Sequence, residues 1–233
     1  MRLCIIPARG GSKRIPRKNI KTFGGRPMIE WSIRVALQSK CFDRVLVSTD
    51  DSEISQVAVA CGAEVPFLRP VELSDDHTAT IPVIAHAIDW QNSNGEQVTE
   101  ACCLYATAPF VKCEDLRVGL EKLLLGDAVY VFTLTSFPYP IQRALRVNSH
   151  QQVEMFQPEH FNTRSQDLPE AWHDAGQFYW GKANAWLSQT PIFGKCSSAV
   201  QIPRWRVQDI DTPEDWKRAE LMFNCLNQIP EGL

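Results

Sequence analysis

A stretch near the start of the sequence, residues 5–20, combines five basic side chains with two adjacent glycines ("IIPARGGSKRIPRKNI"). It begins with a short apolar run and continues as a polar loop. Adjacent glycines let backbone N–H groups approach an anion closely, while lysine and arginine supply charge and hydrogen-bond donors. This combination indicates a phosphate site with donors from Arg9, Gly10, Gly11, Ser12, Lys13 and Lys18.

The spacing of these residues excludes two common phosphate-binding motifs. A dinucleotide-binding turn needs G-x-G-x-x-G, but Gly10 and Gly11 are adjacent and no third glycine follows at that spacing. A P-loop needs a serine or threonine directly after its lysine, and Lys13 is followed by arginine. The alternative is a solvated basic turn without a ligand. Its position directly after an apolar strand favours the phosphate site.

A second group of residues with chemical potential is the stretch "DIDTPEDW", residues 209–216. Asp209 and Asp211 are two positions apart at the end of a predicted strand, so on extended backbone they project to the same side. Two carboxylates together with phosphate oxygens and water are ligands that Mg²⁺ accepts. The alternative is that one of them caps the helix that begins near Pro213, although Thr212 is an equally good cap. Asp50 also lies at the carboxyl end of a predicted strand, where a site residue is expected. Its alternative is a loop carboxylate or the cap of the helix that begins at residue 52.

The elements that must position these residues follow from the periodicity of apolar side chains. Short apolar runs predict strands at residues 3–8, 44–50, 63–68, 100–109, 127–135, 198–203 and 205–211. Amphipathic stretches predict helices at residues 27–40, 52–62, 80–91, 114–125, 182–189 and 213–226. This order predicts an α/β fold, a mostly parallel sheet covered by helices on both faces. Ligands of such sheets bind at the carboxyl ends of the strands.

Residues 136–173 interrupt the regular pattern with four prolines and little periodicity. A long irregular segment inside an α/β domain is more often a lid or a subunit arm than a second domain. We therefore expect one domain, residues 1–233, that contains residues 136–173 as an inserted arm or lid.

Composition and charge limit the kinds of partner. The formal net charge is −3, so anion binding must be local, and neither a nucleic acid nor a membrane is expected as a partner. The eight cysteines form no C-x-x-C pair, and most of them sit in apolar runs, as reduced thiols of a cytoplasmic protein do. No signal peptide and no membrane-spanning stretch is expected.

Several stretches carry a resemblance to a known family. "ARGGSKRIPRKNI", "GGRPMIEWSI", "STDDSEI", "FLRPVELSDD" and "DIDTPEDW" resemble, in order and spacing, the sugar cytidylyltransferases that activate sialic-acid-type nonulosonates (the acylneuraminate cytidylyltransferase, or CMP-sialic acid synthetase, family). "PIQRAL" and "RSQDLPEAWHDAGQFYWG" are more similar to the pseudaminic acid cytidylyltransferases. In "LYATAP", Tyr105 stands where sialic acid enzymes tend to carry glutamine.

The resemblance implies a Rossmann-like nucleotidyltransferase fold and a reaction. CMP would pass from CTP to the anomeric hydroxyl of a nine-carbon 2-keto acid sugar, pseudaminic acid foremost, with release of pyrophosphate. The resemblance also implies Mg²⁺ as cofactor and a homodimer formed through the arm. Sialic acid, legionaminic acid and the eight-carbon keto acid Kdo stay open as acceptors. Two other classes are a non-catalytic nucleic-acid-binding domain, disfavoured by the net charge, and a nicotinamide-dependent enzyme, which would need the missing glycine fingerprint.

The resemblance also assigns site residues. The catalytic set is Arg9, Lys13, Lys18, Asp209 and Asp211, and the last two are the metal ligands. The nucleotide set is Ala8, Arg9, Gly10, Gly11, Ser12, Lys13, Lys18, Asn19, Arg69, Thr78 and Ala79, where Asn19 would face the ribose or base and the last three the cytosine. The alternative interpretation of Arg69 is an arginine on the protein surface. The sugar set is Tyr105, Gln142, Arg143, Arg164, His173 and Asp174, and a general-base role for His173 is left open against a structural one.

Overall fold

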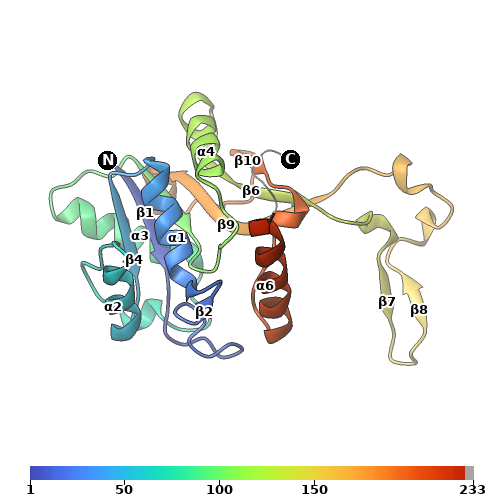
Figure 1. Ribbon diagram of the computed structural model, residues 1–233. Helices are drawn as coiled ribbons and strands as arrows, with labels where there is room; N and C mark the ends of the chain where they lie inside the picture. Colours follow the sequence, from blue (N-terminus) through green and yellow to red (C-terminus); the bar gives the residue numbers. More distant parts are fainter. Residues whose placement is uncertain (229–233) are drawn as a thin grey trace.

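A six-stranded sheet forms the centre of the molecule in the computed structural model, which describes residues 1–228 (Figure 1). Its strand order is β10-β6-β9-β5-β1-β4. The strands are β1 (Arg2–Pro7), β4 (Arg44–Ser48), β5 (Glu100–Leu104), β6 (Tyr130–Ser136), β9 (Trp172–Lys182) and β10 (Ser197–Gln201). β9 pairs antiparallel with both of its neighbours, and the other pairs of the sheet are parallel. The predicted mostly parallel, Rossmann-like sheet is confirmed.

Helices cover both faces of this sheet, as predicted. They are α1 (Met28–Ser39), α2 (Ser52–Ala60), α3 (Thr80–Ser93), α4 (Cys113–Leu125), α5 (Ala183–Leu187) and α6 (Pro213–Gln228). Successive residues of a strand point to opposite faces. Accordingly, Cys4 of β1 lies in the core formed with α1, α2 and α4, and Ile5 lies in the core formed with α3 and α5. A third apolar cluster packs Trp216 and Phe223 of α6 against Phe23.

Phe23 belongs to a short hairpin of β2 (Thr22–Phe23) and β3 (Arg26–Pro27), which follows the basic loop. A 3-10 turn, η1 (Val71–Leu73), lies between α2 and α3. Within residues 1–228, no helix has both the length and the apolar character needed to cross a membrane.

Two predicted strands are wrong. Residues 63–68 form only isolated bridges, from Glu64 to Leu46 of β4 and from Leu68 to Thr49 directly after β4, because Pro66 has no N–H to donate to a ladder. Residues 205–211 form no strand either: Arg204–Arg206 make the 3-10 turn η5, and the chain then runs irregularly to α6. This turn follows Pro203 and buries the side chain of Arg206.

The irregular segment 136–173 projects from the body as an arm (Figure 1). It contains a hairpin of β7 (Leu145–Val147) and β8 (Val153–Met155), which the sequence pattern did not predict. Three 3-10 turns accompany the hairpin: η2 (Ile141–Arg143), η3 (Pro158–His160) and η4 (Ser165–Asp167). The arm returns to the sheet as β9 and carries several exposed apolar side chains.

A buried ion pair anchors the irregular segment that precedes α6. Arg206 donates to both carboxylate oxygens of Asp115 at the start of α4, at 2.6 and 2.9 Å. The two side chains are only 9% and 10% exposed. The backbone carbonyl of Arg206 also accepts a hydrogen bond from the buried Gln177, at 2.6 Å. These contacts hold the chain that leads to Asp209 and Asp211.

Replacing Asp115 by Asn should destabilise the fold. The change leaves the guanidinium of Arg206 buried without its counter-charge, which typically costs about 3–5 kcal/mol. Glu114→Gln is the matched control, because Glu114 forms an exposed pair with Arg117 worth less than about 1 kcal/mol. Urea unfolding of both variants measures the difference. Equal losses for the two variants would contradict the anchoring role.

Candidate functional site

Two adjoining cavities lie where β1 and β5 end. The first, called here the basic cavity, has a volume of about 450 Å³ and is lined by residues that include Arg9, Ser12, Lys13, Lys18, Asn19 and Asp211. The second, called the neighbouring cavity, has about 890 Å³ and is lined by residues that include Thr135, His173, Asp174, Arg204, Asp209 and Arg218. Tyr105, directly after β5, lines both. The structure thus brings most of the predicted site residues to one edge of the sheet.

The basic loop is tied to the turn that follows β4. The N–H of Gly10 donates to Asp50 at 2.9 Å. It therefore forms a hydrogen bond within the protein instead of binding an anion, contrary to the expectation for this glycine. A Cβ at Gly10 would come within 2.6 Å of Asp51 Oδ2, which is the reason for a glycine there. A Cβ at Gly11 would meet only Arg9, at 3.7 Å. Ala8 is buried, and its N–H donates to the β4 backbone.

Carboxylates pair with the cations of the loop. Arg9 and Lys13 both contact Asp76, and these hydrogen bonds, Lys13 first, lower the pKa of Asp76 to about 2. Lys18 donates to Ile210 O at 2.6 Å and to Asp211 at 3.2 Å. The cations are therefore held in place by acidic side chains, which an anionic ligand would replace.

The alternatives that the sequence left open for Asp50 and for the helix caps are decided by geometry. Asp51, not Asp50, caps α2 by accepting from the N–H groups of Glu53 and Ile54. Asp51 also pairs with Arg17 of the basic loop. Asp50 instead fixes the loop through Gly10.

The residues expected near the ribose and base have mainly structural contacts. Asn19 is 7% exposed, lines the basic cavity and donates to the carbonyl of Arg9 at 3.0 Å. Arg69 is 6% exposed and donates to Ser48, so the interpretation as a surface arginine is wrong. Burial, the largest influence, lowers the pKa of Arg69 to about 10. Thr78 is bonded to Asp75, and Ala79 directly precedes α3. These last three predicted residues do not line the basic cavity.

Asp209 and Asp211 lie between the two cavities, and neither caps α6. Thr212 is the cap, because its N–H donates to Asp215 at 2.8 Å and its hydroxyl accepts from the Asp215 N–H at 3.2 Å. The pKa of Asp209 is raised, first because burial disfavours its charged form and second because of the negative charge of Asp211. Two carboxylates that repel each other in this way favour a shared cation.

The carboxylate pair fits a divalent cation that is completed by a ligand. Residues 1–228 contain no group of three or more His, Cys, Asp or Glu side chains able to hold a metal ion. The remaining ligands would therefore be phosphate oxygens and water, as is usual for Mg²⁺.

In the neighbouring cavity, a bend in β9 positions His173 and Asp174. The pairing of β6 with β9 shifts register between Phe132 and Leu134, and Gly176 has a φ of +61°. Asp174 accepts from the Gly176 N–H at 2.9 Å and from the Tyr179 hydroxyl at 2.5 Å. His173 Nδ1 lies 2.9 Å from the Asp174 carbonyl. Because a carbonyl only accepts, this contact assigns the proton to Nδ1 and leaves the lone pair of the neutral ring on Nε2.

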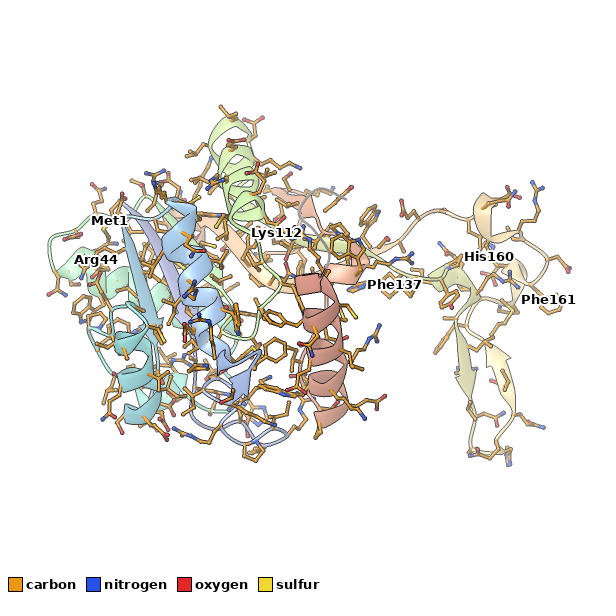
Figure 2. The ribbon with its side chains drawn as sticks, viewed as in Figure 1. Met1, Arg44, Lys112, Phe137, His160 and Phe161 are labelled. Carbon is orange, nitrogen blue, oxygen red and sulfur yellow. The ribbon has the colours of Figure 1, made fainter. Side chains whose placement is uncertain are left out.

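Three predicted sugar-site residues lie elsewhere. Gln142 donates to Pro169, Arg143 to Ser165 and Arg164 to Asp167, so these hydrogen bonds stay inside the arm. The arm extends outward from Phe137 to His160 and Phe161 (Figure 2). The structure does not bring these three side chains to the cavities of their own chain.

The neighbouring cavity instead contains two arginines that sequence reasoning missed, Arg204 and Arg218. The sequence signal for Arg218 was its position near the start of the helix that follows the carboxylate pair. Arg204 had no local signal, because it lies between the two predicted strands 198–203 and 205–211, of which the second does not form.

Comparisons with known proteins show the family and the fold. A family model described as "Cytidylyltransferase" matches residues 3–212. The chain is 48% identical over 221 residues to the pseudaminic acid cytidylyltransferase of Campylobacter jejuni, which covers 95% of each chain. It is 30% identical to the CMP-N,N'-diacetyllegionaminic acid synthase of Legionella pneumophila, over 97% of each chain. The solved structure of a CMP:2-keto-3-deoxy-manno-octonic acid synthetase complexed with CTP has the same fold, with a TM-score of 0.70, 17% identity and coverage of 97% of this chain and 99% of that one.

The link between the basic loop and α2 predicts a pH-dependent stability. The Arg17 hydrogen bond is the main cause that lowers the pKa of Asp51 from 3.8 to about 2. Such a carboxyl stabilises the fold above its unfolded pKa and loses that contribution as the pH falls towards the folded value. Asp51→Asn keeps a capping side chain but loses the charge. We expect this variant to be less stable than the wild type at neutral pH, with a difference that shrinks from about pH 4 to about pH 2.

Urea unfolding at a series of pH values measures this difference. Asp89→Asn, on the exposed side of α3, is the control and should follow the wild type throughout. A constant difference between Asp51→Asn and the wild type at every pH would contradict the role of the charge.

Proposed function

The chain belongs to the cytidylyltransferase family, and we propose that it transfers CMP from CTP to the anomeric hydroxyl of pseudaminic acid, releasing pyrophosphate. The similarity to the Campylobacter jejuni enzyme over nearly the whole of both chains carries the choice of acceptor. The two adjoining cavities, with a carboxylate pair between them, suit a reaction between a triphosphate and a second substrate.

In this proposal the basic cavity binds the triphosphate of CTP. Arg9 and Lys13 exchange Asp76 for phosphate oxygens, and Ser12 and the Gly11 N–H add donors. Lys18 contacts Asp211 of the carboxylate pair and stabilises the charge that develops at the α-phosphate and on the leaving pyrophosphate. Asn19 keeps the loop in shape through its bond to the Arg9 carbonyl.

The reaction of this family uses a divalent cation, and we propose Mg²⁺ held by Asp209 and Asp211. The ion would supply positive charge to the α-phosphate and polarise the attacking hydroxyl. Asp211 must then leave its pairs with Arg14 and Lys18, which frees both cations for phosphate.

The neighbouring cavity holds the acceptor sugar in this proposal. His173 Nε2 carries the lone pair and accepts the proton of the anomeric hydroxyl, while the Asp174 carbonyl fixes the ring tautomer. Tyr105, which lines both cavities, separates the nucleotide from the sugar.

The arm is proposed to form a homodimer, within one nucleotidyltransferase domain that contains residues 136–173 as an insertion. Its apolar side chains are unusually exposed: Tyr139 by 80%, Phe156 by 61% and Phe161 by 70%. Burying such side chains against a second copy is favourable. In such a dimer, Gln142 and Arg143 would reach the site of the neighbouring subunit.

A cytoplasmic location is proposed on chemical grounds. All eight cysteines are free thiols, which persist in a reducing compartment. The nucleic-acid-binding alternative gains no support, because the cations of the loop line a concave cavity and are already paired with carboxylates.

Pyrophosphate release is the direct test of the proposed reaction. The purified protein should release pyrophosphate with CTP, Mg²⁺ and pseudaminic acid, and not with ATP, GTP or UTP. Addition of a chelator should stop the reaction, and Asp211→Asn should lower kcat by at least about 100-fold, because a metal ligand and counter-charge is lost.

Lys217→Gln, a surface change on α6, should leave the rate unchanged. Turnover with CTP and legionaminic or sialic acid alone would keep the reaction and overturn the acceptor. No turnover with any keto acid sugar would overturn the reaction itself.

The proposed dimer predicts a change of mass when the arm loses its apolar surface. Sedimentation of the wild type should give twice the chain mass of 26.4 kDa. Phe156→Ser combined with Phe161→Ser should give monomers of unchanged thermal stability, because both side chains are exposed in the single chain. A wild type that sediments as a monomer would contradict the proposal.

A further inference from the structure

Binding the proposed acceptor sugar in the neighbouring cavity poses an electrostatic problem. A 2-keto acid sugar carries a carboxylate, and the cavity already contains the side chain of Asp174, whereas Asp209 is proposed to hold the divalent cation. Like charges at close range oppose binding, most strongly where protein replaces water. A cation facing the cavity is therefore needed to bind the acid.

Two arginines are unpaired in residues 1–228, and both line this cavity: Arg204 and Arg218. Each of the other described arginines has an ion pair or donates a side-chain hydrogen bond within the protein. A guanidinium binds a carboxylate through two parallel hydrogen bonds, so a free one is a ready receptor.

The position of Arg218 follows from the packing of α6. Trp216, Ala219 and Phe223 face the apolar cluster beneath the helix. Arg218 and Met222, four residues apart and so on one side of the helix, line the cavity, and Met222 also packs against the apolar cluster. Hydrogen bonds from Thr212, and more weakly the charge of Arg218, lower the pKa of the neighbouring Asp215. The Asp215 carboxylate is hydrogen-bonded to Thr212 and forms no hydrogen bond with Arg218.

Arg204 comes from a different element, the turn η5. This turn is fixed by the buried pair of Arg206 with Asp115 two residues later. The cavity therefore has one free cation from α6 and one from η5, and both elements are anchored in the body of the protein. The arm arginines that the sequence suggested, Arg143 and Arg164, are already bonded inside the arm.

We propose that Arg218, assisted by Arg204, binds the carboxylate of the acceptor sugar and thereby selects 2-keto acids over neutral sugars. This inference rests on the proposed function. It makes both arginines specificity residues for the sugar that do not contact the nucleotide.

Steady-state kinetics with two acceptors test the proposal. Arg218→Gln should raise KM for the sugar acid by about 10- to 100-fold, the loss of a charged hydrogen-bonded pair. Its KM for CTP should stay within about twofold, which also shows that the variant is folded. Arg204→Gln should give a smaller effect of the same kind, and Arg218→Lys should recover part of the loss. Lys217→Gln, the adjacent residue on α6, removes the same charge and should change neither KM.

The carboxamide of the same sugar is the second acceptor. The wild type should favour the acid strongly over the amide, and Arg218→Gln should lose most of this preference. An unchanged KM for the acid in Arg218→Gln overturns the proposal, as does an unchanged preference. A large effect of Arg143→Gln or Arg164→Gln with none of Arg218→Gln would assign the carboxylate to the arm.

A wild type without turnover would contradict the proposed function rather than this inference. In that case calorimetric titration of the sugar acid into wild type and Arg218→Gln still measures the carboxylate site. Equal affinities of the two proteins would then overturn the inference.

Discussion

The site depends on one electrostatic constraint. A cavity for a triphosphate must gather several cations, yet the chain must hold those cations together when the ligand is absent. The protein meets this constraint by giving each loop cation that lines the basic cavity a carboxylate: Asp76 for Arg9 and Lys13, and Asp211 for Arg14 and Lys18. These pairs are exposed enough to be exchanged for phosphate, because partly exposed ion pairs contribute little stability.

The same pairs connect distant parts of the chain. Lys18 joins the basic loop to Ile210, 192 residues later, and so aligns the phosphate donors with the carboxylate pair. The segment that carries this pair has no strand ladder to hold it. Its position comes from two fixed ends, the buried Arg206–Asp115 pair and the cap of α6 at Thr212. Here the buried pair of Arg206 and Asp115 takes the place of the missing backbone hydrogen bonds.

The sheet explains why two cavities meet. β1 and β5 run parallel and end at the same edge, where their loops form the basic cavity. β9 runs the opposite way, so the chain enters it from the arm at that same edge and brings His173 and Asp174 beside Tyr105. One reversed strand thus places the two cavities side by side and leads directly to the surface proposed for a second subunit.

The sequence by itself determined the local features: the buried parallel strands, the amphipathic helices, the basic loop and the pair Asp209 and Asp211, because each depends on residues close in the chain. It also carried the family, through motifs spread over most of its length. Tertiary structure decided which charges are free. Three features depend on partners 40 or more residues away: Arg206 is buried, Gly10 donates to Asp50, and Arg218, rather than Arg143 of the arm, faces the cavity. The local sequence pattern does not identify such partners.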